Sequence, residues 1–216
     1  MKDKEDKNLC IIYLVRHGQT ESNKAEYIMG HLDALLTEDG EMQVKQTANE
    51  LKDVHFDAVF SSDLGRAHRT AEIIKLERDL AVQTTQALRE RNFGRWENKT
   101  IEEFRKNFKE IYEKMREADH NERVKFKPSP DMESDEEIIS RFITFLREVA
   151  VAYRGKTVLV ATHGGCIRTF LIHLGYFTYK NIPSGAVENA GYVKVSSDGV
   201  DFFVDEVRGV KDKLSD

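Results

Sequence analysis

Three short apolar runs, each followed directly by polar residues and then by a helical pattern, constrain the fold of this chain more than any other feature. They are residues 10–15 (CIIYLV), 58–62 (AVFSS) and 157–162 (TVLVAT). Continuous apolar runs of this length are typical of strands that are buried on both faces of a sheet. Because such strands need helices on both sides, the runs favour an α/β domain with a mainly parallel sheet.

Helical patterns fill the intervals between these strands. Thr37 is a candidate N-cap for one helix, and residues 100–118 carry apolar side chains at helical spacing. Ser134 and Glu137 have the spacing of a capping box at the start of a third helix. A fourth helix is expected directly after the strand at 157–162.

Further strands are expected at 81–84 and near the end of the chain, where residues 191–197 and 201–207 form a hairpin pattern around a tight turn at Asp198. The whole pattern predicts a three-layer α/β fold, with a mostly parallel, twisted sheet and helices on both faces. Ligands of such folds bind beyond the carboxyl ends of the strands, so we expect the functional site there.

The composition is that of a single globular domain. Of the 216 residues, 40% are hydrophobic and 33% are charged, and no linker or repeat divides residues 1–216. The net charge of −5 argues against a general nucleic-acid-binding role. No window approaches the roughly 18 uncharged apolar residues of a membrane span. Cys10 and Cys166 form no disulfide framework. We therefore expect a cytoplasmic protein with buried, reduced thiols and no membrane or nucleic-acid partner.

Arg16, His17 and Gly18 follow the first strand and form a candidate nucleophile motif. A neutral imidazole accepts a phosphoryl group when its other nitrogen is held by a hydrogen bond. The neighbouring arginine offers a planar fork that matches phosphoryl oxygens, and its charge lowers the histidine pKa. Gly18 would let the backbone approach the anion closely. Taken alone, this short motif also fits a structural histidine.

A second histidine occupies an equivalent place after the strand at 157–162, in the run Thr162-His163-Gly164-Gly165. The start of the following helix presents backbone N–H groups that favour an anion. His163 could donate a hydrogen bond to a phosphoryl oxygen as charge develops, although a buried structural histidine is an equal alternative at this position.

Two further segments supply candidate residues for the same reaction. Arg66 lies in the first helical turn after the strand at 58–62, where its side chain could reach the same oxygens. Glu90 lies in the segment LRERNFGRWE. A carboxyl group beside a bound phosphoryl dianion favours its protonated form and can donate that proton to the leaving oxygen. The seven histidines show no close-spaced pairing, so we expect neither a metal nor another cofactor.

Several segments together resemble the histidine phosphatase superfamily. They are LVRHGQTESN, GHLDALLTEDG, SSDLGRAHRTA, LRERNFGRWE, MESDEEIISRF and VATHGGCIR, which occur in the order seen in the branch that contains cofactor-dependent phosphoglycerate mutases, fructose-2,6-bisphosphatase and small broad-specificity phosphatases. The resemblance covers residues 9–170 and implies the phosphoglycerate mutase-like fold. It also implies roles for single residues: phosphorylation of His17, a phosphate pocket of Arg16, Arg66 and His163, proton donation by Glu90, and substrate contacts by Asn23, Gly164, Gln19 and Thr20.

The resemblance leaves three functions open. Residues 93–97 are closer to the F-G-x-W-E form of the family's phosphatases than to its mutases, and the tail at 208–216 is short and charged. These features favour a phosphomonoester hydrolase that acts on small phosphorylated metabolites. The alternatives are a 2,3-bisphosphoglycerate-dependent phosphoglycerate mutase and a non-catalytic regulatory or binding protein. Segments 24–32 and 92–132 are expected to form a lid that determines the substrate; the pattern indicates neither the substrate nor the oligomeric state.

Overall fold

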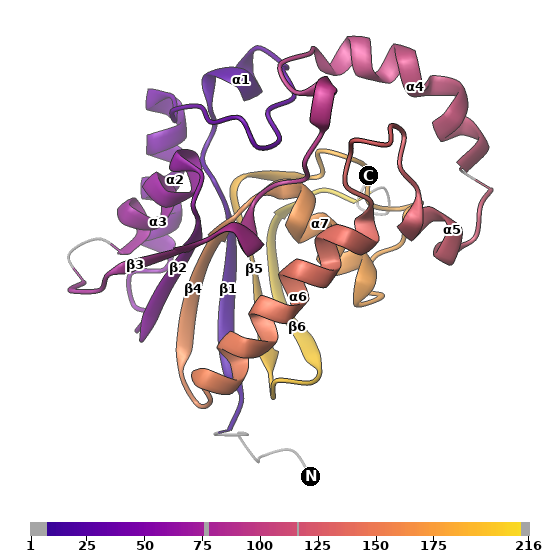
Figure 1. The fold of residues 1–216 in the computed structure, drawn as a ribbon. Helices are drawn as coiled ribbons and strands as arrows, with labels where there is room; N and C mark the ends of the chain where they lie inside the picture. The colour runs from indigo at the N-terminus through magenta and orange to yellow at the C-terminus, as the bar shows by residue number, and fades with distance from the viewer. Residues whose placement is uncertain (1–7, 76–77, 116, 213–216) are drawn as a thin grey trace.

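A six-stranded mixed sheet forms the centre of the molecule in a computed structural model, which describes residues 8–75, 78–115 and 117–212 (Figure 1). The strand order is β3-β2-β4-β1-β5-β6. The strands are β1 (Cys10–Arg16), β2 (Ala58–Ser62), β3 (Val82–Thr85), β4 (Thr157–Thr162), β5 (Val187–Ser197) and β6 (Phe202–Val210). The first four are mutually parallel, whereas β5 is antiparallel to β1 and β6 is antiparallel to β5.

The register of the two central strands determines where the functional site lies. In the parallel pair of β1 and β4, Arg16 is the partner of Thr162. The two strands therefore end at the same level, and the residues that follow them, His17 and His163, leave the sheet side by side.

Alternate residues of β1 pack against different layers of helices. Ile12 and Leu14 belong to the core beneath α6 and α7, whereas Tyr13 and Val15 belong to the core on the face of α2 and α3. All four are buried, so the strand reads as one continuous apolar run. The helices are α1 (Glu21–Lys24), α2 (Glu38–Glu50), α3 (Gly65–Lys75), α4 (Ile101–Met115), α5 (His120–Lys125), α6 (Asp135–Ala152) and α7 (Gly164–His173).

The residues that were predicted to cap the starts of helices do so in the structure. The Thr37 hydroxyl accepts a hydrogen bond of 2.8 Å from the Gly40 N–H, which caps α2. Ser134 and Glu137 form a capping box at the start of α6, with each side chain accepting from the other residue's backbone N–H.

The three-layer α/β fold and its principal strands are therefore confirmed, with small differences in extent. β3 begins one residue later than expected, and both strands of the terminal hairpin are longer. The short helices α1 and α5 were not anticipated, because each has fewer than two turns and shows no periodicity. The expected helix at 100–118 is shorter, since α4 ends at Met115 and residues 117–118 are not helical. Residue 116 and residues 213–216 of the charged tail lie outside the described residues.

The segments expected to form a lid lie beyond the carboxyl ends of the parallel strands, where α1 and α4 cross the top of the molecule (Figure 1). Ile28 from the first segment packs in a small separate core with Phe104, Phe108 and Met132 from the second. This shared core joins the two segments and keeps them above the strand ends.

We expect Phe142→Ala in α6 to lower the free energy of unfolding by about 3–5 kcal/mol, because Phe142 is fully buried and its loss leaves a cavity. Val151→Ala on the same helix is the control; its side chain is largely exposed, so the change should stay within about 0.5 kcal/mol. Urea unfolding of both variants measures the difference. Equal losses would mean that the α6 face is not part of the main core.

Candidate active site

His17 is held in position by the sheet and by its own loop. Its backbone N–H donates to the Thr162 carbonyl at 3.0 Å, which continues the pairing of β1 with β4 by one residue. Its Nδ1 lies 2.7 Å from the Gly18 carbonyl oxygen. Because a carbonyl oxygen only accepts, Nδ1 carries the proton in this bond, and Nε2 keeps a free lone pair. The imidazole thus has the tautomer that a nucleophile needs.

The surroundings of His17 keep it neutral. Burial lowers its pKa well below the ordinary value, and the charges of Arg16 and Arg66 lower it further. The hydrogen bond to Gly18 acts in the opposite direction and is the smallest of these effects. The imidazole therefore remains an electron-pair donor at neutral pH and below.

His163 faces His17 from the N-terminus of α7. The ring centroids are 5.2 Å apart, with an angle of 62° between the planes. His163 is completely buried, and neither ring nitrogen has a hydrogen-bond partner within the described part of the chain. Its pKa is lowered well below the usual value, first by burial and then by the nearby charges, foremost that of Arg66. Two unpaired nitrogens at this depth indicate a ligand-binding role, because buried polar groups are otherwise satisfied.

Two arginines bring positive charge to the same place. The Arg16 Nη1 donates to the Val187 carbonyl at 2.5 Å, while its buried Nε has no partner among the described residues. Arg66 is buried at the start of α3 and donates to the carbonyls of Gly30 and Leu32 at 2.7 and 2.6 Å. Burial lowers the pKa of both guanidiniums, yet an arginine retains its proton in a protein. The pocket is therefore cationic.

Glu90 points toward the same end of α7. Its carboxylate accepts hydrogen bonds from the Gly165 N–H at 3.0 Å and from the Arg91 N–H at 2.8 Å. A Cβ atom on Gly165 would lie 2.3 Å from the Glu90 carboxylate, and one on Gly164 would lie 3.1 Å from the Arg16 side chain. The two glycines thus make the room in which the acid and the arginine approach the helix.

Of the remaining residues expected to contact the substrate, some line the cavity and one does not. Thr20 and Asn23 line the cavity above His17, as does Gly164. The Asn23 amide oxygen accepts from Asn189 at 3.2 Å, so the amide nitrogen is the donor that Asn23 can present to a ligand. Gln19 is placed differently: its side-chain oxygen accepts from the Thr37 hydroxyl at the start of α2, and it does not line the cavity.

Gly18 also lies away from the cavity, contrary to the expectation that it approaches the anion. A Cβ at this position would lie 2.5 Å from the carbonyl oxygen of Gly40 in α2. The absence of a side chain therefore serves the packing of the loop after β1 against the first turn of this helix.

A cavity of about 680 Å³ opens above His17, whereas His163 is completely buried and does not line it. Its floor holds Arg16, His17, Arg66 and Glu90. The upper wall comes from the lid segments and is largely apolar, with contributions from Ile28, Met29, Phe93, Ile101, Phe104 and Tyr112. Four cations also line it, namely Arg91, Arg105, Lys109 and Arg168. A small phosphate ester fits this arrangement, with the anion at the floor and the organic part against the lid.

No group of three or more histidine, cysteine or acidic side chains within residues 8–75, 78–115 and 117–212 is arranged to hold a metal ion. Among the helices described, none combines the length and apolar character that crossing a bilayer requires.

The structure also shows residues that the motifs did not reveal as part of the site. Asn189 donates to the His17 carbonyl at 3.1 Å, and the His31 ring lies 2.9 Å from the Glu90 carbonyl. Glu133 and Arg141 bind the backbone around Glu90. Glu133 and Arg141 lie within the segment MESDEEIISRF, and His31 lies within GHLDALLTEDG, so Asn189 alone of the four lies outside the segments that carry the resemblance. The roles of these residues cannot be read from the segments without knowing what the side chains contact.

Comparison with known proteins gives a consistent picture. A family model described as the histidine phosphatase superfamily, branch 1, matches residues 12–208. Phosphoglycerate mutase-like protein 4 of Arabidopsis thaliana is 35% identical over 77% of this chain and 72% of its own. The uncharacterized phosphatase PhoE of Bacillus subtilis is 33% identical over 77% of this chain and 78% of its own. The crystal structure of a phosphoglycerate mutase from Bacillus anthracis superimposes with a TM-score of 0.80 at 26% identity, covering 94% of both chains.

The two buried histidines predict how stability depends on pH. In the unfolded chain a histidine has a pKa of about 6.5, whereas His17 and His163 have lowered pKa values when folded. Below about pH 6.5 the unfolded chain therefore binds protons that the folded chain does not. The part of the free energy of unfolding that depends on the two neutral histidines is fully present above this pH. It decreases as the pH falls, by about 1 kcal/mol for each histidine between pH 7 and pH 5.5.

Urea unfolding at the two pH values tests this expectation. His163→Gln should remove about half of the pH-dependent loss, because one titrating group is gone. His55→Gln is the control, since His55 is exposed and does not line the cavity, and it should leave the loss unchanged. A loss that persists in full in His163→Gln would show that other groups cause it.

Proposed function

Because the chain belongs to the histidine phosphatase superfamily, we propose that it is a metal-independent phosphomonoester hydrolase that acts through a phosphohistidine on small phosphorylated metabolites. The observation that supports this most directly is the set of buried donors around His17. The Nε of Arg16 and both ring nitrogens of His163 are without partners in the described structure, and the His163 ring centroid lies 5.2 Å from that of His17. The Arg16 N–H and the single N–H of a neutral His163 are therefore available to a phosphoryl group on His17.

In the first step, Nε2 of His17 attacks phosphorus and the bond from phosphorus to the ester oxygen breaks. Arg16, Arg66 and His163 stabilise the negative charge on the three equatorial oxygens. Glu90 donates its proton to the departing oxygen, so the leaving group departs as a neutral alcohol. Asn23 and Thr20 contact the bound group from the loop after His17, and Gly164 does so through its backbone N–H.

In the second step, water attacks the phosphohistidine and the phosphorus–nitrogen bond breaks. Glu90, now a carboxylate, accepts a proton from that water, and inorganic phosphate leaves. His17 returns to the neutral form in which its Nδ1 proton is bound to the Gly18 carbonyl. The cycle therefore needs no cofactor.

The phosphoglycerate mutase reaction is the principal alternative, because relatives at comparable identity carry mutase as well as phosphatase names. The two reactions share the phosphoenzyme and differ in what accepts the phosphoryl group. The presence of all five core residues argues against a non-catalytic role; they are Arg16, His17, Arg66, Glu90 and His163.

We further propose that residues 1–216 act as one domain whose lid consists of segments 24–32 and 92–132. Their side chains form the upper wall of the cavity, which supports a role in substrate choice. A cytoplasmic location is consistent with the two cysteines, both of which are buried and unpaired.

We expect His17→Asn to abolish turnover, with kcat/KM lower by about 10³-fold or more, because the variant lacks the imidazole that accepts the phosphoryl group. The variant should also lose the acid-labile, base-stable phosphoenzyme that the wild-type protein forms with radiolabelled substrate. His173→Gln on the exposed side of α7 is the matched control and should retain both properties. A His17→Asn protein that keeps a tenth of wild-type activity would exclude His17 as the nucleophile.

The fate of the phosphoenzyme distinguishes the hydrolase from the mutase. We expect isolated phosphoenzyme to release inorganic phosphate in buffer alone at a rate comparable with turnover, since a hydrolase admits water to the intermediate. The measurement compares phosphate release in buffer with transfer to added 3-phosphoglycerate. Slow release together with fast transfer to the acceptor would make the mutase reaction the function of this protein.

A further inference from the structure

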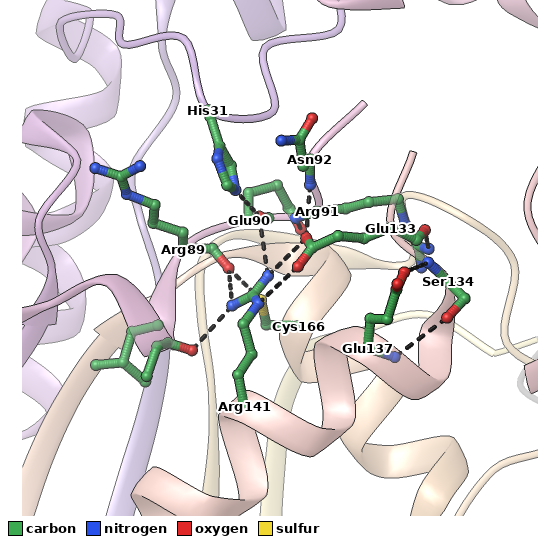
Figure 2. A network of polar contacts seen from close by, with 12 residues as sticks. His31, Arg89, Glu90, Arg91, Asn92, Glu133, Ser134, Glu137, Arg141 and Cys166 are labelled. Carbon is green, nitrogen blue, oxygen red and sulfur yellow. Dashed lines mark hydrogen bonds and ion pairs between the residues drawn. The ribbon is translucent and has the colours of Figure 1, made fainter. Parts of the chain in front are cut away.

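Arg141 on α6 binds the backbone of the segment that carries Glu90, as Figure 2 shows. Its Nη1 donates to the carbonyls of Ala87 and Arg89 at 2.9 and 2.7 Å, and its Nη2 donates to the Glu90 carbonyl at 3.1 Å. A single side chain thus holds carbonyl groups on both sides of the candidate acid.

The same guanidinium also binds Glu133, at the other end of the lid. Arg141 Nε and Nη2 donate to the two carboxylate oxygens of Glu133, each at 3.0 Å. Together with the three carbonyls, these bonds use all five N–H donors of the guanidinium. The planar fork is therefore fully satisfied, which is the arrangement that a lysine ammonium cannot reproduce.

Glu133 continues the network to the residue after Arg91. Its carboxylate accepts from the Asn92 N–H at 2.7 Å, and its own N–H donates to the Asn92 carbonyl at 2.9 Å. Burial favours the neutral form of Glu133, but hydrogen bonds from Arg141 and Asn92 outweigh it and lower the pKa of this carboxyl. Glu133 thus stays ionised while it holds both partners.

Further contacts hold the same segment from the strand side. The Thr162 hydroxyl donates to the Leu88 carbonyl at 2.9 Å, and the Cys166 thiol donates to the Arg89 carbonyl at 3.0 Å (Figure 2 shows the latter residue). Burial raises the pKa of Cys166 to about 12, so the thiol keeps the proton that it donates. With the His31 ring at the Glu90 carbonyl, residues 88–90 have every backbone carbonyl bound.

We propose that Glu133 and Arg141 are positioning residues for the general acid: they hold the backbone at residues 87–92 so that the Glu90 carboxyl stays at the N-terminus of α7, within reach of the leaving oxygen. This inference rests on the proposed function, in which Glu90 protonates that oxygen. Neither residue lines the cavity, so both act through Glu90 and not through contact with the substrate.

The effect on the acid follows from its geometry. Among the residues that the structure describes, two backbone N–H groups bind the Glu90 carboxylate, those of Gly165 and Arg91. The side chain therefore follows its backbone, and a shift of about 1 Å is enough to cost about 10²-fold in rate. We call the contacts of Glu133 and Arg141 with residues 87–92 the clamp. Loss of the clamp should slow phosphoryl transfer from esters whose leaving oxygen needs a proton, and it should spare transfer from esters whose leaving group departs unprotonated.

The test compares Arg141→Lys with the wild-type protein on two substrates. With glycerol 3-phosphate, whose alkoxide leaving group needs a proton, kcat/KM should fall by about 10²-fold. With 4-nitrophenyl phosphate, whose leaving group departs unprotonated, it should fall by less than about threefold. Inhibition by vanadate, which reports on the pocket around His17, should also change by less than about threefold. Equal losses with both substrates would overturn the proposal and leave Arg141 with a structural role alone.

Two further variants sharpen the comparison. Arg147 lies on the same helix and is exposed, and its guanidinium donates to the Val200 carbonyl at 3.2 Å, away from Glu90. Arg147→Lys should therefore leave activity on both substrates unaffected. In a Glu90→Gln background, Arg141→Lys should cause no further loss with glycerol 3-phosphate, because the acid through which it acts is already absent. An additional loss of about tenfold or more would show that Arg141 acts by another route.

A crystal structure of Arg141→Lys keeps the inference separate from the proposed function. If the wild-type protein turned over no phosphomonoester, the proposed function would be wrong. The position of Glu90 in the variant's crystal structure would still test whether Arg141 holds this residue in place. We expect the bond between Glu90 and the Gly165 N–H to be lost in the variant. A Glu90 carboxyl that stays in place at this N–H group would refute the positioning role.

Discussion

The parallel pairing of β1 with β4 is the interaction on which the rest of the structure depends. The ladder runs to Arg16 opposite Thr162, and the bond from the His17 N–H to the Thr162 carbonyl extends it by one residue. Both strands therefore end at one level and bring the imidazoles of His17 and His163 to 5.2 Å. A register shift of one residue would turn every side chain of β1 to the opposite face, which the buried residues on both faces do not allow.

The charge of the pocket follows from how its arginines are bound. Arg16 donates to a backbone carbonyl, and Arg66 donates to two, with Asp33 at 3.7 Å as its ion-pair partner. Carbonyl groups orient a guanidinium but do not neutralise it, so positive charge remains at the floor of the cavity. Burial is the first cause of the lowered pKa values of the two histidines, and this charge lowers them further while it favours a phosphoryl anion. One electrostatic arrangement thus serves both requirements.

The sequence was sufficient to predict what depends on local pattern and on strand order. The buried strands, the caps at Thr37 and Ser134, and the meeting of His17 with His163 at the strand ends all belong to this group. The sequence could not predict tertiary contacts. The orientation of Gln19 toward α2 and the close approach of Gly18 to Gly40 depend on how a helix packs against a loop. The role of Arg141 was likewise not predictable, because the groups through which it holds the Glu90 segment are backbone carbonyls some 50 residues away, and any sequence provides those.

The paired bonds between Asn92 and Glu133 have a consequence for how this protein can change. These bonds hold the two ends of segment 93–132 together, and we call this pair of residues its neck. The chain therefore leaves the sheet domain and returns to it at one place. Parts of the segment beyond the neck that contact neither residues 26–31 nor α6 can be lengthened, shortened or replaced while the two anchored residues and the backbone beside them keep their places. Evolution is therefore free to remake the upper wall of the cavity, and with it the accepted ester, without disturbing the groups at the floor that break the phosphate bond.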